Sequence, residues 1–161
     1  MAGDATKIIV GAATVSVGGT DVGYTKGGVT VRYEPEFIEV IADQAVGVVK
    51  KARSLERMYV TTTLLQVSLD EVRKSFMLPS AQLASGSTLT LGYNNACWVE
   101  EVAIVIVGKG PNCGTRTFNF TKCITFGTRE YAMTREEEVA FEVEFEVLKN
   151  SDGNFGTIID T

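Results

Sequence analysis

The chain has 161 residues, of which 45% are hydrophobic, and its 15 basic and 20 acidic side chains give a net charge of −5. This length fits one domain with a sizeable core, and the acidic balance argues against a protein that grips nucleic-acid phosphates, which requires a basic surface. Histidine is absent, which excludes Ser-His-Asp and Cys-His catalysis and removes the commonest metal ligand.

Neither a membrane span nor a secretory signal is visible in the sequence. The longest unbroken apolar run covers residues 102–107, far short of the roughly 20 residues that a spanning helix needs. The first residues lack a basic region followed by an apolar stretch, so we expect the chain to be made and folded in a cytosol. The spacings of Cys97, Cys113 and Cys123 match neither a metal site nor a redox pair, which predicts free thiols and no cofactor.

In the N-terminal half, alternating and β-branched segments bounded by turn residues predict five strands. They cover residues 8–17, 29–33, 37–42, 46–50 and 57–66, with Pro35 between the second and the third. Gly18 and Gly23 have the outer spacing of a phosphate-binding loop, but Tyr24 and Thr25 stand where Lys and Ser/Thr are required. These glycines therefore predict turns rather than a nucleotide site.

Residues 68–77 are predicted to form the one helix. Ser68 and Glu71 have the spacing of a capping box, in which each side chain bonds the backbone N–H of the other residue. Apolar residues follow at helical spacing, and Pro79 stops the helix.

The C-terminal half predicts strands at residues 89–92, 98–107, 115–126 and 138–147. In the last of these, Glu142, Glu144 and Glu146 alternate with valine and phenylalanine, so the strand has one acidic and one apolar face. The glutamates lie roughly 6–7 Å apart, and in water their repulsion is a few tenths of a kcal/mol. Many copies side by side would turn them into a continuous negative wall.

Two groups of charged residues have both a functional and a plain interpretation. Glu100 and Glu101 are adjacent, so on a regular strand they face opposite ways and cannot act as a catalytic pair. A basic group, Lys50, Lys51, Arg53 and Arg57, is either a solvated patch or a surface that meets the acidic face of a neighbouring copy. The sequence thus predicts no enzyme.

Eight or so strands and one short helix predict a mainly β protein, a β-sandwich or half-open barrel. We expect residues 1–149 to form this domain and residues 150–161, which start with turn residues, to form an arm that orders on assembly. Long strand edges invite pairing with another chain, so a homo-oligomer is expected.

The glycine-rich segment carries a resemblance to a known family. Residues 17–31 (VGGTDVGYTKGGVTV), followed by residues 33–36 (YEPE) and 43–44 (DQ), resemble the N-terminal part of tail tube proteins of long-tailed bacteriophages. These motifs cover about the first third of the chain, and the remainder agrees with the family in the order and length of its elements.

The resemblance implies a β-sandwich that forms a homohexameric ring with a shared inner β-barrel. Rings stack into a hollow tube in the virion tail, assembled in the host cytoplasm around a tape-measure protein, without cofactor or membrane. Tail terminator, distal tail and, in contractile tails, sheath proteins are further implied partners. Double-stranded DNA passes through the bore without specific binding.

The resemblance also gives roles to residues. A hairpin over residues 34–51 is expected to reach toward the next ring, with these candidate inter-ring or inter-subunit residues: Phe37, Ile38, Val40, Ile41, Lys50, Lys51 and Arg53. The candidate lumen-facing residues are Glu142, Glu144 and Glu146, whose carboxylates would repel the DNA phosphates.

Three alternatives stay open at this stage. The acidic strand can instead face outward, toward solvent or a sheath, and the threonine-rich face of residues 115–125 is a competing lumen surface. From a different functional class, the chain can be a monomeric β-sandwich module that binds a carbohydrate or another small ligand through Trp98, Tyr59 and Tyr93.

Overall fold

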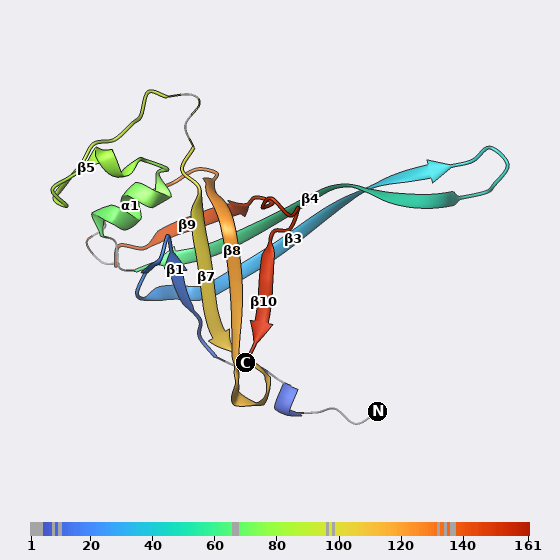
Figure 1. The fold of residues 1–161 in the computed structure, drawn as a ribbon, viewed down its shortest axis with the longest axis horizontal. Coiled ribbons are helices and arrows are strands. Elements are labelled where there is room, and N and C mark those ends of the chain that lie inside the picture. The colour runs from blue at the N-terminus through green and yellow to red at the C-terminus, as the bar shows by residue number, and fades with distance from the viewer. Residues whose placement is uncertain are drawn as a thin grey trace.

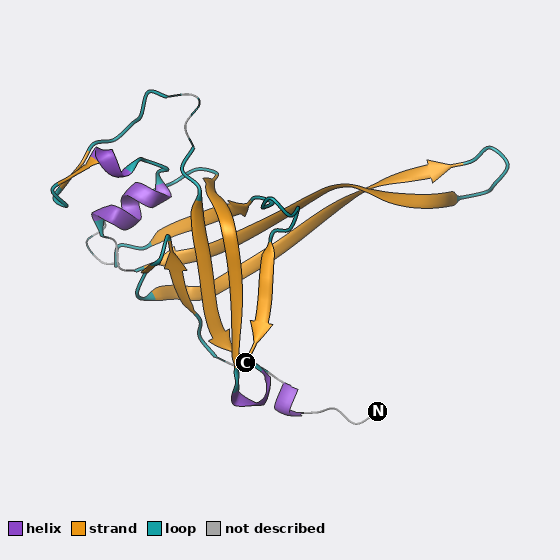
Figure 2. Cartoon of the chain, in the orientation of Figure 1, coloured by secondary structure: helices purple, strands orange, loops and turns teal. Residues whose placement is uncertain are grey.

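The computed structural model describes residues 5–7, 9, 11–65, 68–95, 97, 99–131, 133, 135 and 138–161. Strands dominate this part of the chain, which confirms the predicted mainly β fold class (Figure 2). The strands are β1 (Thr14–Val17), β2 (Thr20–Asp21), β3 (Thr25–Ile41), β4 (Val48–Leu64), β5 (Leu83–Ala84), β6 (Thr88–Leu89), β7 (Val102–Lys109), β8 (Thr115–Phe126), β9 (Phe141–Val147) and β10 (Gly156–Asp160).

The described helices are short. They are α1 (Leu69–Ser75) and the 3-10 turns η1 (Ala5–Lys7), η2 (Ser80–Gln82) and η3 (Pro111–Cys113). None of them has the length and apolar character to cross a membrane.

One antiparallel sheet contains most of the strands, in the order β2-β1-β7-β8-β9-β4-β3. The long strand β8 is shared: its second half pairs with β9, and its first half pairs with β10 on the same side. Because of this sharing the sheet curls, and β3, β4 and β9 run across the direction of β7 and β8 (Figure 1). The result is a half-open barrel, one of the two architectures that the strand pattern predicts.

The core lies on the concave side of this sheet. Alternate residues of β9 face it (Phe141, Val143, Phe145 and Val147), and each stands opposite a residue of β4 on the same face. Buried side chains of β1, β7 and β8 complete the cluster, with Val15, Ile104, Ile106 and Phe120 among them. The buried residues of β9 are the apolar half of the alternation of apolar and acidic residues predicted for this strand.

Pro35 does not divide two strands as predicted. Residues 25–41 form one continuous strand, β3, and residues 48–64 form another, β4. β3 is the last strand of the sheet, so a residue without a backbone N–H is tolerated on its unpaired side. The predicted strand over residues 29–33 is part of β3, and Gly27 and Gly28 form a bulge just before it, where both have positive φ.

Other strand boundaries also differ from the predicted ones. β1 covers only the end of the predicted 8–17 strand, and β9 starts at Phe141 instead of residue 138. β7 is shifted toward the C-terminus relative to the predicted 98–107 strand. The prediction for residues 115–126 is confirmed in both boundaries.

The threonine-rich surface predicted on β8 does not exist as a single face. Val102 pairs with Cys123 and Ile104 pairs with Phe120, so β8 has one residue more than β7 in this interval. This bulge reverses the alternation. Phe118 and Phe120 point inward before it, and Cys123 and Thr125 are buried after it. The competing lumen surface is therefore split between two faces.

The C-terminal segment lies in the chain's own sheet, although the sequence suggested an arm. β10 pairs with β8, and Arg116 holds Asp160 through two contacts of 2.6 and 2.7 Å. Gly156 allows this pairing, because a Cβ there would collide with the carbonyl oxygen of Asn119. The turn residues at the start of this segment thus form the loop that precedes the short strand β10. The division of the chain at residue 150 stays a prediction.

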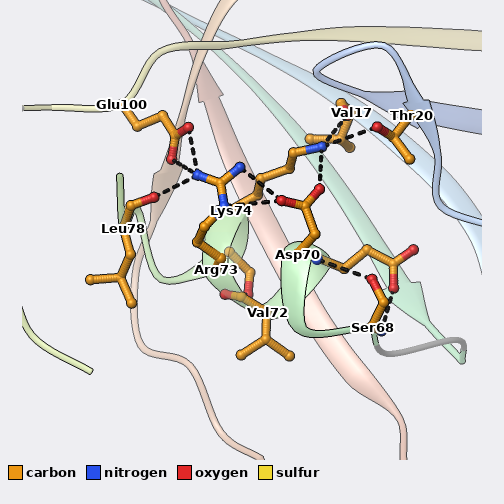
Figure 3. Close-up of polar contacts among 11 residues, drawn as sticks. Val17, Thr20, Ser68, Asp70, Val72, Arg73, Lys74, Leu78 and Glu100 are labelled. Carbon is orange, nitrogen blue, oxygen red and sulfur yellow. Dashed lines mark hydrogen bonds and ion pairs between the residues drawn. The ribbon is translucent and has the colours of Figure 1, made fainter. Parts of the chain in front are cut away.

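The helix α1 is fixed to the body by two cations (Figure 3). Its capping box is confirmed, since Ser68 and Glu71 bond each other's backbone N–H. Arg73, which is 6% exposed, donates to the Leu78 carbonyl at 2.7 Å and to Glu100 at 2.9 Å, and also pairs with Asp70. These contacts tie the helix to the segments that follow it.

Lys74 makes the second attachment. Its Nζ donates to the Val17 carbonyl at 3.1 Å and pairs with Asp70 at 2.9 Å, which connects α1 to the β1–β2 turn (Figure 3). The cations of the last helical turn therefore reach both the preceding and the following parts of the fold.

We expect Arg73→Met to lower the free energy of unfolding by about 1–3 kcal/mol, because it leaves a half-buried carboxylate and a carbonyl without their charged donor. Urea denaturation measures the change. Lys50→Met, at an exposed position, is the control and should stay within about 0.5 kcal/mol of the parent protein. An equal effect of the two substitutions would show that the Arg73 contacts do not hold the helix.

Candidate assembly surfaces

The ends of β3 and β4 and the turn that joins them form a hairpin that projects beyond the body (Figure 1). We call residues 36–55 the hairpin arm. Phe37, Ile38, Val40 and Ile41 are all exposed, by 47–68%. Val46, Val48 and Val49 add to this surface. The structure therefore places the four predicted apolar contact residues together and uncovered.

Both faces of the hairpin arm are partly apolar. Phe37 and Ile41 stand opposite Arg53 and Val48 on one face, whereas Ile38 and Val40 stand opposite Ala52 and Lys50 on the other. A contiguous exposed apolar surface of this kind marks an interaction site.

The three predicted basic residues of the hairpin arm are placed differently from one another. Lys50 is exposed, and Lys51 pairs with Glu39 across the arm at 2.6 Å with both side chains largely in solvent. Arg53 is turned back toward the body, where it binds Glu56. The sequence did not predict this, because residues three apart on a regular strand face opposite ways.

Glu56 lies where the hairpin arm leaves the body. Its Oε1 accepts a hydrogen bond from the Tyr33 hydroxyl at 2.8 Å and binds Arg53, and its Oε2 accepts one from Lys149 Nζ at 2.7 Å. These donors come from β3, β4 and the segment after β9. Hydrogen bonds from Lys149 first, and then from Tyr33, lower the pKa of Glu56 to about 2. No motif in the sequence pointed to this cluster.

Glu142, Glu144 and Glu146 share the outward face of β9, as the alternation predicted. They lie opposite Thr63, Thr61 and Tyr59 of β4, and Ile124 and Phe126 of β8 flank them on the other side. Glu142 is exposed, and the other two are half-buried. Their orientation toward a lumen stays a prediction.

The acidic face is not uniformly negative. Arg32 Nη2 pairs with Glu144 at 3.0 Å, while its Nε pairs with Glu34 at 2.8 Å, and the guanidinium lies 4.7 Å from the centre of the Tyr59 ring. Arg129 donates to the Glu144 carbonyl at 2.8 Å, and burial lowers the pKa of this arginine. Glu144, the middle residue of the three, thus has a cation at its carboxylate and a second one at its backbone carbonyl.

Of the aromatic residues proposed for ligand binding, the structure describes two, Tyr59 and Tyr93, and they have different surroundings. Tyr59 is 3% exposed, beneath Arg32 and with its ring centre 5.4 Å from that of Phe126. Tyr93 is exposed beside a cavity of about 340 Å³ that Phe76 and Leu91 help to line. Trp98 lies outside the described residues.

Other titratable residues have structural surroundings. Glu100 binds Arg73 and Glu101 pairs with Lys122 at 3.2 Å, so the two neighbours do have different partners. Cys97 and Cys113 are exposed thiols, and burial raises the pKa of the Cys123 thiol to about 12. Across the described ranges, we find no group of three or more acidic or cysteine side chains placed to hold a metal ion.

Comparison with known proteins gives a similarity at the level of fold. No protein-family model and no curated protein matches the chain. Among solved structures, it is similar to the cap that terminates the tube of the anti-feeding prophage, with a TM-score of 0.53 and 12% identity over 92% of this chain and 88% of that chain. This similarity confirms a phage-tail-like fold; membership of the major tail proteins of long-tailed phages stays a prediction.

A second alignment is weaker. A chain of the extended sheath–tube complex of the extracellular contractile injection system PVC aligns with a TM-score of 0.49 and 13% identity, over 93% of this chain and 89% of that chain.

We expect the Glu56 carboxylate to titrate near pH 2 rather than at its ordinary pKa of 4.5. Because its pKa is lower in the folded than in the unfolded chain, ionised Glu56 stabilises the fold above about pH 4.5, and this contribution is lost as the pH falls toward 2. Carbon-detected NMR of the side-chain carboxyl measures the midpoint. Lys149→Met should move the midpoint upward, and a midpoint near 4.5 in the parent chain would contradict the assignment.

Proposed function

We propose that the protein is a structural subunit of a phage-tail-like tube. Six copies join edge to edge into a ring, and rings stack through the hairpin arm into a hollow tube in a virion tail. The observation that carries this proposal is the hairpin arm itself, whose apolar residues face outward on both sides. The fold shared with a tube-terminating cap supports the same role.

The hairpin arm needs a partner for physical reasons. An isolated two-stranded ribbon is marginally stable in water, and this one exposes a phenylalanine and several branched aliphatic side chains. Fully burying one such side chain contributes about 1.5–3 kcal/mol. A neighbouring copy that covers the four apolar residues would therefore stabilise both the arm and the contact.

The strand edges supply the contact within a ring. Among the described strands, β3 ends the sheet on one side, and β10 has only β8 as a neighbour. Such edges present backbone groups that can pair with another chain. Pairing of one edge with a different edge of the next copy is a head-to-tail contact, which closes a ring when the rotation fits.

We further propose that the acidic face of β9 lines the bore. DNA carries about one negative charge per 1.7 Å of its axis, so carboxylates on the wall would oppose its adhesion during passage. At physiological salt this repulsion extends about 8 Å, and the centre of the channel stays open to DNA. A tape-measure protein would occupy the bore during assembly, and terminator, distal tail and sheath proteins would contact the ends or the outside.

We expect concentrated protein to form hexameric rings or long tubes, visible by negative-stain electron microscopy. Phe37→Ser with Ile41→Ser should leave the monomer folded, since both residues are exposed. It should raise the concentration for half-maximal assembly more than about tenfold, because the lost burial exceeds about 1.4 kcal/mol.

Leu91→Ser is the matched control, an exposed apolar residue in the loop before β7. This variant should assemble like the parent protein. If light scattering shows a monomer at every concentration of the parent protein, the tube proposal is wrong.

We expect the triple substitution of Glu142, Glu144 and Glu146 by lysine to leave tubes assembling but to slow DNA delivery, because the wall would then attract phosphates. Particles built with the variant are compared in a DNA-ejection assay. The triple glutamine variant is the control for charge reversal and should have a smaller effect. Unchanged delivery with the lysine variant would place this face away from the bore.

A further inference from the structure

Glu56, in β4, is bonded by residues from β3, from the adjoining part of β4 and from the segment after β9. Tyr33 belongs to β3, Arg53 to the hairpin arm, and Lys149 to the loop between β9 and β10. The Glu56 side chain is 17% exposed, so these bonds form in a largely sheltered position. We call Glu56 and its three donors the Glu56 joint.

A β-bulge makes the joint possible. Glu36 pairs with Leu55 and Phe37 pairs with Arg53, so Ser54 is an extra residue in β4. The bulge brings Arg53 to the same face as Glu56, where a regular strand would turn it away. Met58 continues this face into the core, and the joint therefore lies where the buried face of β4 ends.

Lys149 also contacts the segment that leads to the C-terminal strand β10. Its ammonium lies 5.3 Å from the centre of the Phe155 ring, and Phe155 packs against the core. Between these two residues the chain makes a tight turn, in which Asn150 donates to the Asn154 carbonyl at 2.8 Å. The Asn150 side chain also accepts hydrogen bonds from the backbone of Asp152 and Asn154, both at 3.0 Å. A short turn with its own hydrogen bonds therefore connects Lys149 to β10.

Two hollows flank the joint. Glu56 lines a cavity of about 500 Å³ with Arg53 and Leu148, and a second of about 310 Å³ with Val31 and Phe118. Phe155 lines both. Between these hollows, the polar bonds of Glu56 directly join Arg53, at the base of the hairpin arm, to Lys149, at the start of the turn.

We infer that Glu56 is a positioning residue that couples the direction of the hairpin arm to the turn leading into β10, so that the two segments are ordered together. This coupling is a property of the single chain and does not rest on ring formation. Within a tube it would link the arm to the β10 edge of the same subunit.

Hydrogen–deuterium exchange on the unassembled chain tests the coupling, with peptides from residues 36–55, 148–158 and, as an internal reference for folding, 102–109. Glu56→Gln should accelerate exchange in both the arm and the turn about tenfold or more, the size expected when charge-assisted hydrogen bonds are lost. Lys149→Met should do the same, and Lys149→Arg should retain the parent rates because it keeps the cation.

The double variant distinguishes coupling from two local effects. If Glu56 and Lys149 act through one contact, the double variant should exchange no faster than either single variant. Glu39→Gln is the matched control, because it breaks the ion pair with Lys51 within the arm, and it should affect the arm alone. Acceleration by Glu56→Gln in the arm only, or additive effects of the two single variants, would overturn the inference. Tube assembly is scored separately by microscopy, so failure of one proposal does not imply failure of the other.

Discussion

The pairing of β4 with β9 ends at Met58, and the extra residue at Ser54 lies just beyond that point, where the hairpin arm leaves the body. On the body side of this bulge, β4 presents Met58, Val60 and Leu64 to the core. Beyond it, the same ribbon has exposed apolar residues on both faces. The inserted residue brings Arg53 to the face of Glu56, the carboxylate at the base of the hairpin arm.

The charge of the outward face of β9 also depends on a residue from another strand. In sequence the outward face of this strand is uniformly acidic, yet Arg32 from β3, 112 residues away in sequence, pairs with the middle glutamate. Because Arg32 also pairs with Glu34, it weakens the negative charge at the centre of the face without cancelling it. In the proposed ring, the charge along the wall would therefore be uneven within each subunit.

Local patterns predicted a large part of the fold. The capping box at Ser68, the limits of β8 and the two faces of β9 depend on neighbouring residues alone, and all three are confirmed. Features that depend on the partner strand were missed. Pro35 is compatible with a strand because β3 is at an edge of the sheet. The bulges at Ser54 and in β8 are defined by which residues of two neighbouring strands pair, and the sequence of one strand does not specify that pairing. The Glu56 joint follows from such a bulge, so no sequence spacing indicated it.

The arrangement of charges on the hairpin arm explains how an exposed apolar surface can still bind one partner in preference to others. Lys50, Lys51 and Glu39 alternate with the apolar residues on its two faces, so a partner must satisfy charged and apolar groups together, and random contacts leave charges unpaired. A single arm gives a weak contact under this constraint. In the proposed hexameric ring six arms would engage at once, and each further contact would form at high effective concentration. Stacking would therefore begin only after rings have formed, which favours ordered tubes over irregular aggregates.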